Sequence, residues 1–232
     1  MSNEIIFLLM TILVLGASLF AFRMGRFWLY GFIAICIVLA NIFVTKQFVI
    51  FGITATGGNI TYGAIFLATD LLCEHYGKKD SRRAVFLGLF GAVFYLLTSQ
   101  CILLFEAAES DLVHGSMQTI FSFAPRIVLA SLVAYLIAQL HDVWFFHFLK
   151  QKFHGNWLWL RNNLSTAVSQ LIDSAAFSVV AFLGLFPLDV VLQIILSTYL
   201  LKLLVALIDT PFIYLSYRLR PSELQPPATA GS

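Results

Sequence analysis

The apolar residues of this chain fall into seven long segments that are separated by short polar connections. Most segments reach the ~20 residues that a helix needs to cross the hydrocarbon core of a bilayer. The sequence therefore predicts an all-α polytopic membrane protein, with six to seven transmembrane helices in one bundle. The segments lie at roughly 5–22, 27–45, 48–76, 84–105, 119–148, 163–186 and 188–217. We expect residues 1–220 to form a single transmembrane helical domain and residues 221–232 to form a polar tail.

The third segment carries three glycines near its start, Gly52, Gly57 and Gly58. Glycine weakens a helix interior, so a helix is not expected to run through this stretch unbroken. The first part of the segment is interpreted as a re-entrant or interfacial piece. This interpretation is the reason for a range of six to seven crossings.

The composition supports the membrane assignment and excludes several classes of protein. Of the 232 residues, 60% are apolar and 11% are charged, and the mean hydropathy is +0.90. Soluble domains average about 45–50% apolar and about 25% charged residues. A soluble enzyme, a secreted disulfide-rich module and a disordered chain are therefore excluded.

The charged residues of the connections separate by sign. Alternate connections hold 11 of the 14 lysines and arginines, whereas the opposite set holds only Lys46 together with most of the acidic loop residues. Positively charged connections stay on the cytoplasmic side of a membrane. We therefore expect the N-terminus outside and the C-terminus in the cytoplasm.

Several charged residues fall inside the apolar segments. An ionised side chain at the centre of a bilayer costs ~2.5–3.5 kcal/mol on insertion scales, so these residues must face the interior of the bundle. Together they predict a polar cavity, and the alternative for each is an ion pair that only holds helices together. The residues are Asp70, Glu74, Arg126, Asp142, Asp173, Lys202 and Asp209.

Helical spacing places many of these residues on common faces. In the third segment, steps of three and four residues align Asn59, Tyr62, Phe66, Asp70 and Glu74. An ion pair with Lys78 or Arg82 is the alternative for Glu74.

The sixth segment shows the same spacing at Asn163, Thr166, Gln170, Asp173 and Phe177. Asp173 lies ~15 Å from the start of this segment, close to the middle of the membrane. A salt bridge to Lys202 or Arg126 is the alternative for its role.

Lys202 in the last segment is also expected near the middle of the membrane, and it shares a face with Asp209. Amide and carboxylate groups on such faces can read the polar edge of a planar heterocycle, and aromatic rings can stack on its flat surface. Motifs for hydrolases, metalloproteases and nucleotide binding are absent from the sequence, and no two histidines are four residues apart. We therefore expect no catalytic residue, metal site, cofactor or nucleic-acid partner.

Three stretches of the chain carry specific motifs: 58–77 (GNITYGAIFLATDLLCEHYG), 159–173 (WLRNNLSTAVSQLID) and 199–212 (YLLKLLVALIDTPF). Their specific features are an aromatic residue before the pair TD, then ExYG, and an RNN run followed by SQ and D. In these features the chain resembles the queuosine precursor transporters of bacterial inner membranes, and the resemblance covers about residues 30–217.

The resemblance implies import of 7-cyano-7-deazaguanine and 7-aminomethyl-7-deazaguanine for tRNA modification. It also implies a fold similar to the substrate-binding components of vitamin uptake transporters. Nine residues are predicted to bind the substrate: Asn59, Tyr62, Phe66, Asp70, Glu74, Asn163, Gln170, Asp173 and Lys202.

Three mechanisms fit this sequence. In the first, the chain acts alone as a multi-pass transporter in contact with membrane lipid, either coupled to protons or by facilitated diffusion. In the second, it captures substrate for a complex that an ATPase energises. In the third, it is an intramembrane enzyme that uses Asp70 and Asp173 as a catalytic pair. Small-residue faces, such as Ala17 with Ala21 and Ala130 with Ala134 and Ala138, permit a homodimer.

Overall fold

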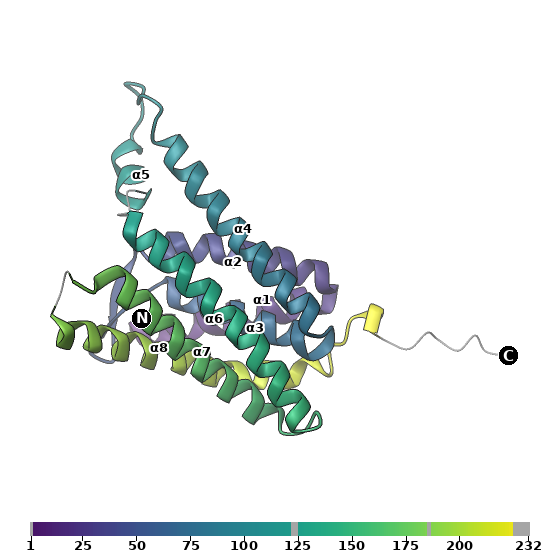
Figure 1. Ribbon diagram of the computed structural model, residues 1–232. Helices are drawn as coiled ribbons and strands as arrows, with labels where there is room; N and C mark the ends of the chain where they lie inside the picture. The colour runs from purple at the N-terminus through teal and green to yellow at the C-terminus, as the bar shows by residue number, and fades with distance from the viewer. Residues whose placement is uncertain (1, 122–124, 185–186, 225–232) are drawn as a thin grey trace.

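A computed structural model describes residues 2–121, 125–184 and 187–224 of the chain. Within these residues the chain is almost entirely helical, and a short β-hairpin interrupts it between the second and third helices (Figure 1). The elements are α1 (Asn3–Met24), α2 (Arg26–Phe43), β1 (Gln47–Ile50), β2 (Ile53–Thr56), α3 (Gly58–His75), α4 (Lys78–Ile102), α5 (His114–Phe121), α6 (Pro125–Lys152), α7 (Leu158–Phe182), α8 (Leu188–Ser216) and a 3-10 turn at Ser222–Leu224.

Six of the described helices are long and apolar enough to cross a membrane. They are α1, α2, α4, α6 from Leu129 onward, α7 and α8. The prediction of an all-α polytopic membrane protein is confirmed. The two remaining helices, α3 and α5, overlap the third and fifth predicted apolar segments. The segment 48–76 divides into the hairpin and α3, whereas the segment 119–148 begins in α5 and continues as α6.

Helix α3 lies at the centre of the bundle, where it contacts α1, α2, α4, α6 and α8. Most of its residues are buried, including every residue from Gly63 to Cys73. Its approach to α8 is close, because a Cβ atom at Gly63 would collide with the Val205 side chain. This close packing brings the first half of α3 against the middle of α8.

The glycine-rich start of the third segment forms a β-hairpin rather than a helical piece. Gln47–Ile50 pairs antiparallel with Ile53–Thr56, and the two-residue turn at Phe51 and Gly52 has positive φ values of 49° and 74°. Positive φ at both turn positions is typical of the turn that matches the twist of a hairpin. An isolated two-stranded sheet leaves its edges unpaired and is unsuited to hydrocarbon, so we place the hairpin at the membrane surface.

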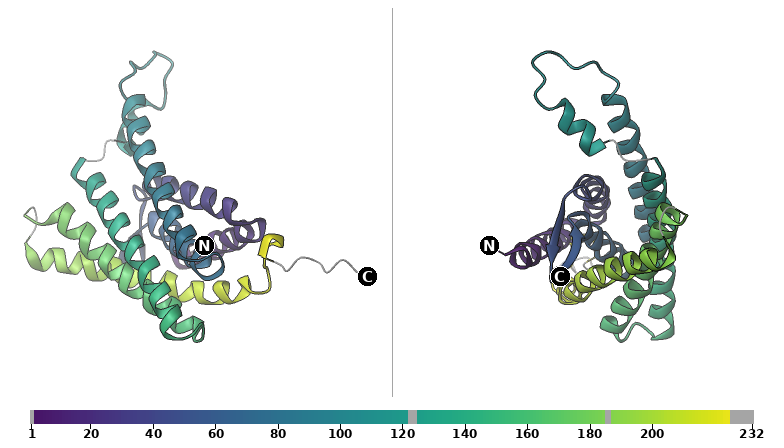
Figure 2. Two further views of the ribbon diagram at one scale, coloured as in Figure 1. Left: turned by 45° about the vertical axis from the view of Figure 1, so that its right-hand side comes forward. Right: turned by 90° about the vertical axis from the view of Figure 1, so that its left-hand side faces the viewer.

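The connections of the bundle separate into two ends (Figures 1 and 2). One end carries the α1–α2, α3–α4 and α6–α7 connections and the end of α8, and we call it the basic end because these segments hold most lysines and arginines. The other carries the N-terminus, the hairpin and the α7–α8 connection, and we call it the hairpin end. Beyond α8, Glu223 accepts hydrogen bonds from the Arg26 backbone nitrogen at 2.9 Å and from the Tyr76 hydroxyl, which ties residues 222–224 to the basic end.

The small-residue stripe of α6 lies inside the bundle. Ala130, Ala134 and Ala138 are at most 1% exposed, so this stripe packs against the protein's own helices. In the α1 stripe, Ala21 is buried and Ala17 is exposed. A homodimer stays a prediction, and the α6 stripe does not supply its surface.

Candidate functional site

A pocket lies in the half of the bundle nearer the hairpin end. It is lined by the last turns of α2, the first turns of α3, the second half of α4, α5, the first halves of α6 and α8, and the second half of α7. Its polar lining residues are Asn41, Thr56, Asn59, Tyr62, Tyr95, Ser99, Ser131, Asp173, Thr198 and Lys202. Of the nine predicted substrate-binding residues, the structure places four in this lining: Asn59, Tyr62, Asp173 and Lys202.

Tyr62, Asp173 and Lys202 form what we call the pocket floor. The Lys202 ammonium makes an ion pair with Asp173 Oδ2, and the Tyr62 hydroxyl donates a hydrogen bond to Asp173 Oδ1 at 3.2 Å. Lys202 Nζ also lies 5.2 Å from the centre of the Tyr62 ring, within cation–π range. Each charge therefore has a partner, as a buried charge requires.

This geometry bears on the alternative role of Asp173. Of the two predicted cationic partners, Lys202 is the one that it contacts, while the side chain of Arg126 lies outside the described residues. Because both members of this ion pair line the pocket, Asp173 can hold α7 against α8 and can also contact a ligand.

The walls of the pocket are largely apolar. Phe177 of α7, Tyr95 of α4 and Phe121 of α5 contribute aromatic rings, and Ala92 and Ala134 leave space between them. The Tyr95 and Phe121 rings meet edge to face with centres 6.1 Å apart. Flat aromatic surfaces beside a charged floor suit a planar ligand with a polar edge.

The structure places Asp70 below the floor, outside the pocket lining. Asp70 is completely buried and accepts a hydrogen bond from Thr166 at 3.2 Å. Asp142 accepts from the Ser165 hydroxyl at 2.7 Å, and Asp209 accepts from the Asn162 amide at 2.7 Å. We call Asp70, Asp142 and Asp209 the carboxyl cluster.

Three further predicted residues also lie outside the lining. Phe66 is completely buried in the core, with its ring centre 6.1 Å from that of Tyr62. Asn163 donates to Thr210 Oγ1 at 2.7 Å and to the Trp159 carbonyl at 2.8 Å. Gln170 is completely buried between the levels of Thr166 and Asp173 on α7, and neither its amide oxygen nor its amide nitrogen has a hydrogen-bond partner among the residues that the structure describes.

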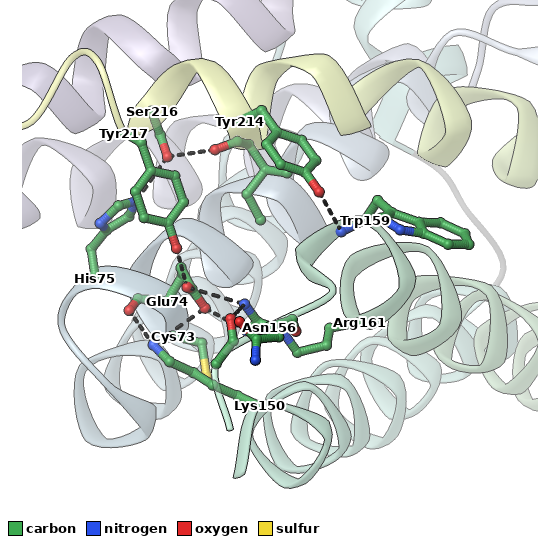
Figure 3. A network of polar contacts seen from close by, with 12 residues as sticks. Cys73, Glu74, His75, Lys150, Asn156, Trp159, Arg161, Tyr214, Ser216 and Tyr217 are labelled. Carbon is green, nitrogen blue, oxygen red and sulfur yellow. Dashed lines mark hydrogen bonds and ion pairs between the residues drawn. The ribbon is translucent and has the colours of Figure 1, made fainter. Parts of the chain in front are cut away.

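Glu74 lies at the basic end, in a network with Lys150, Arg161 and Tyr217 (Figure 3). Arg161 donates to both carboxylate oxygens of Glu74, at 2.7 and 3.3 Å, and Lys150 Nζ lies 3.2 Å from Glu74 Oε2. The alternative prediction that Lys78 or Arg82 pairs with Glu74 is wrong, since its partners are Arg161 and Lys150. Arg161 reaches Glu74 because α7 begins at Leu158, which places Arg161 inside the bundle.

Tyr217 completes what we call the basic-end network by donating its hydroxyl to the Glu74 carboxylate. Burial, and next the hydrogen bond to Glu74, raise the pKa of Tyr217 to about 12. The hydroxyl is therefore protonated at neutral pH and remains a donor. Arg161 is completely buried and also donates to the carbonyls of Asn156 and Gly155, both at 2.9 Å.

Sequence reasoning missed several residues of the site. Tyr95 and Ser99 of α4, Ser131 of α6 and Thr198 of α8 are single polar residues in apolar segments, and such residues are common in membrane helices. The spacing of four between Tyr95 and Ser99 is the signal that could have identified their face. Within the described residues, no group of three or more His, Cys, Asp and Glu side chains is placed to hold a metal ion.

Comparisons with known proteins agree with the resemblance seen in the three stretches. A family model described as "Putative vitamin uptake transporter" matches residues 56–216. A "Probable queuosine precursor transporter" of Bacillus subtilis (strain 168) is 45% identical over 202 residues, which cover 87% of each chain. The "Queuosine precursor transporter" of Escherichia coli (strain K12) is 31% identical over 187 residues, which cover 78% of this chain and 81% of the relative.

No solved structure matches the chain. The family match spans α3 to α8 and includes all three residues of the pocket floor, and the sequence identity extends over most of the chain. This chain therefore belongs to the queuosine precursor transporter family.

Proposed function

We propose that this chain is a transporter of the bacterial inner membrane that imports the queuosine precursors 7-cyano-7-deazaguanine and 7-aminomethyl-7-deazaguanine for tRNA modification. The observation that carries the proposal is a pocket with a charged floor and aromatic walls, in a chain that is 45% identical to a relative named "Probable queuosine precursor transporter". The pocket sits in a bundle that has six candidate membrane spans.

A deazaguanine presents a ring N–H beside an exocyclic amine, and next to them a carbonyl oxygen. The Asp173 carboxylate suits the two donors, and the Lys202 ammonium suits the carbonyl oxygen. Because Asp173 and Lys202 are paired with each other, an arriving base exchanges part of that ion pair for its own hydrogen bonds. Tyr62, Tyr95 and Phe177 are the aromatic groups available to stack on its rings.

The route through the protein follows from its two ends. The pocket lies nearer the hairpin end, whereas Glu74, Arg161, Lys150 and Tyr217 fasten α3, α6, α7 and the end of α8 together at the basic end. Basic connections face the cytoplasm. The N-terminus and the pocket entrance are then outside, the C-terminus is inside, and transport requires a second conformation in which the basic-end network opens.

The chain acts as a transporter rather than as an enzyme. The aspartyl alternative requires Asp70 and Asp173 to share a proton. Asp70 instead lies beside Thr166 in the carboxyl cluster, and Asp173 pairs with Lys202 in the pocket. The two carboxyl groups therefore do not form a catalytic pair.

The experiment is uptake of labelled 7-cyano-7-deazaguanine by the purified protein, reconstituted alone in liposomes. We expect saturable uptake that unlabelled precursor competes for and that adenine does not. Folded protein that neither binds nor transports the precursors would contradict the proposed function. Binding without uptake would favour the alternative in which the chain captures substrate for an ATPase-energised complex.

A further inference from the structure

Between the pocket floor and the basic-end network lie the three acids of the carboxyl cluster, from three different helices. Asp70 is on α3, Asp142 on α6 and Asp209 on α8, and each is at most 1% exposed. Asp70 and Asp142 accept hydrogen bonds from the consecutive residues Thr166 and Ser165 of α7, at 3.2 and 2.7 Å, which brings both carboxyl groups to the same level of the bundle. The remaining partner described for the cluster is the amide of Asn162, which donates to Asp209 at 2.7 Å.

The cluster differs from the other buried acids in its lack of a cation. Glu74 pairs with Arg161 and Lys150, and Asp173 pairs with Lys202. No ion pair reaches Asp70, Asp142 or Asp209 from the side chains that the structure describes. The side chain of Arg126 lies outside the described residues.

The other titratable groups around the cluster do not supply a positive charge. Cys73 of α3 is buried and donates toward the Val143 carbonyl, and His141 of α6 shares a hydrogen bond with Ser169. From α4, the uncharged Ser81 donates to the Thr69 carbonyl. On α7 and α8 the nearest charges, Arg161, Asp173 and Lys202, are already paired.

Neighbouring carboxyl groups that are buried among hydroxyls and an amide are strongly unfavourable as anions when no cation compensates them. The burial of Asp70 and Asp142 without a cation therefore favours a proton bound to this pair. Among the described residues, one oxygen of each carboxyl group in the cluster and the amide nitrogen of Gln139, one helical turn before Asp142, have no hydrogen-bond partner. Because these groups are buried, exchange of the proton requires a rearrangement.

Helices α3 and α8 carry members of both the pocket floor and the carboxyl cluster, and α7 carries Asp173 of the floor together with Thr166, which donates to Asp70. Asp70 follows Tyr62 by eight residues on α3, Thr166 precedes Asp173 by seven on α7, and Asp209 follows Lys202 by seven on α8. About two helical turns therefore separate the two levels on these three helices. A shift of α3 against α6 and α7 that opens the basic end also separates Asp70 from Asp142 and from Thr166.

We propose that the Asp70–Asp142 pair is a proton-binding site through which uptake is coupled to proton entry. The proposal rests on the proposed transport function and specifies its driving force. In the conformation that is open at the hairpin end, the pair holds a proton from the outer side. In the conformation that is open at the basic end, the two carboxyl groups part and the proton leaves to the cytoplasm.

The coupling is tested in liposomes that contain the purified full-length protein, with the membrane potential clamped and uncharged 7-cyano-7-deazaguanine as the probe. Coupling of one proton to one substrate sustains about tenfold accumulation for one pH unit, acid outside, because both correspond to ~1.4 kcal/mol. We expect Asp142→Asn to bring the ratio of uptake with and without the gradient to one. The exposed Asp189→Asn is the matched control and keeps the gradient effect.

The bound proton is tested separately from transport, by infrared spectroscopy of the purified protein. We expect the C=O absorption of protonated carboxyl groups to lose a component in Asp142→Asn, and we expect that component to be retained in Asp209→Asn and in Asp189→Asn. Asparagine preserves the acceptor for Ser165, and Asp70→Asn, which preserves the acceptor for Thr166, provides an independent variant.

Active protein whose uptake ignores the pH gradient would overturn the coupling and leave the transport function standing. Absence of this component from the C=O absorption would overturn the proton site. If the folded protein transports no precursor at all, the proposed function fails, and the infrared measurement still decides whether the site holds a proton.

Discussion

Arg161 and Glu74 are 87 positions apart in the chain and form a bidentate ion pair at the basic end of the bundle. The guanidinium is completely buried, the Glu74 side chain is 4% exposed, and Lys150 and Tyr217 approach the same carboxylate (Figure 3). Bidentate pairs between a guanidinium and a carboxylate are among the strongest charge-assisted hydrogen bonds in proteins. One carboxylate thereby joins α3, α6, α7 and the end of α8.

We expect Glu74→Gln to destabilise the protein strongly. The substitution leaves the buried Arg161 charge without an anion, and breaking a buried pair in this way costs about 3–5 kcal/mol. Thermal unfolding in detergent measures the effect as a lower melting temperature. Glu109→Gln makes the same chemical change at an exposed position and is expected to stay within about 0.5 kcal/mol of wild type. Equal stability of the two variants would show that the Arg161–Glu74 pair does not hold the basic end closed.

Asp173 allows a sharper experiment, because its partner is known. Asp173→Asn removes the carboxylate from the pocket and also leaves Lys202 unpaired, so we expect it to lower both affinity and stability. The double variant Asp173→Asn with Lys202→Met removes both charges, and such paired replacement commonly restores stability.

The two readouts separate recognition from structure. We expect the double variant to recover most of the melting temperature while its affinity for 7-cyano-7-deazaguanine stays at least tenfold below wild type, which is ~1.4 kcal/mol. Ligand titration of the purified proteins gives the affinity. Wild-type affinity in the stable double variant would remove Asp173 and Lys202 from the binding site.

The sequence predicted the polar face of α3 but not how its members divide along the bundle. Tyr62, Asp70 and Glu74 share the predicted face, yet twelve residues of helix spread them over ~18 Å. Tyr62 therefore lies in the pocket, Asp70 in the carboxyl cluster and Glu74 at the basic end. A shared helical face specifies the direction in which side chains point. Their depth in the membrane and their partners depend on where the neighbouring helices begin.

Partners from distant segments were the least predictable part of the site. The predicted apolar segment begins at residue 163 and leaves Arg161 in the connection before it, whereas the structure starts α7 at Leu158. The hairpin was foreseen only as an interruption, since Gly52, Gly57 and Gly58 argue against a helix without specifying strands. The structure shows that Ile50 pairs with Ile53 across a two-residue turn, so this stretch forms a hairpin.

The orientation of the chain is tested by labelling single cysteines from either side of the membrane. Of the native cysteines, Cys36 and Cys73 are buried and Cys101 is exposed, so Cys101→Ser provides the background. We expect Glu109→Cys to react with a membrane-impermeant reagent from outside only and Lys152→Cys from inside only, since both positions are exposed at opposite ends. The reverse pattern would invert the assignment of the termini.

The pocket is tested by substrate protection in the same Cys101→Ser background. Thr198 lies in the pocket lining on α8, one turn before Lys202, and a ligand on the floor would cover it. We expect Thr198→Cys to react with a small thiol reagent added from outside and 7-cyano-7-deazaguanine to slow that reaction at least fivefold at a concentration near 10 Kd, because the site is then about nine-tenths occupied. Glu109→Cys lies far from the pocket, so its labelling rate should not change with ligand. Equal labelling of Thr198→Cys with and without ligand, in protein that binds the ligand, would place the binding site elsewhere in the bundle.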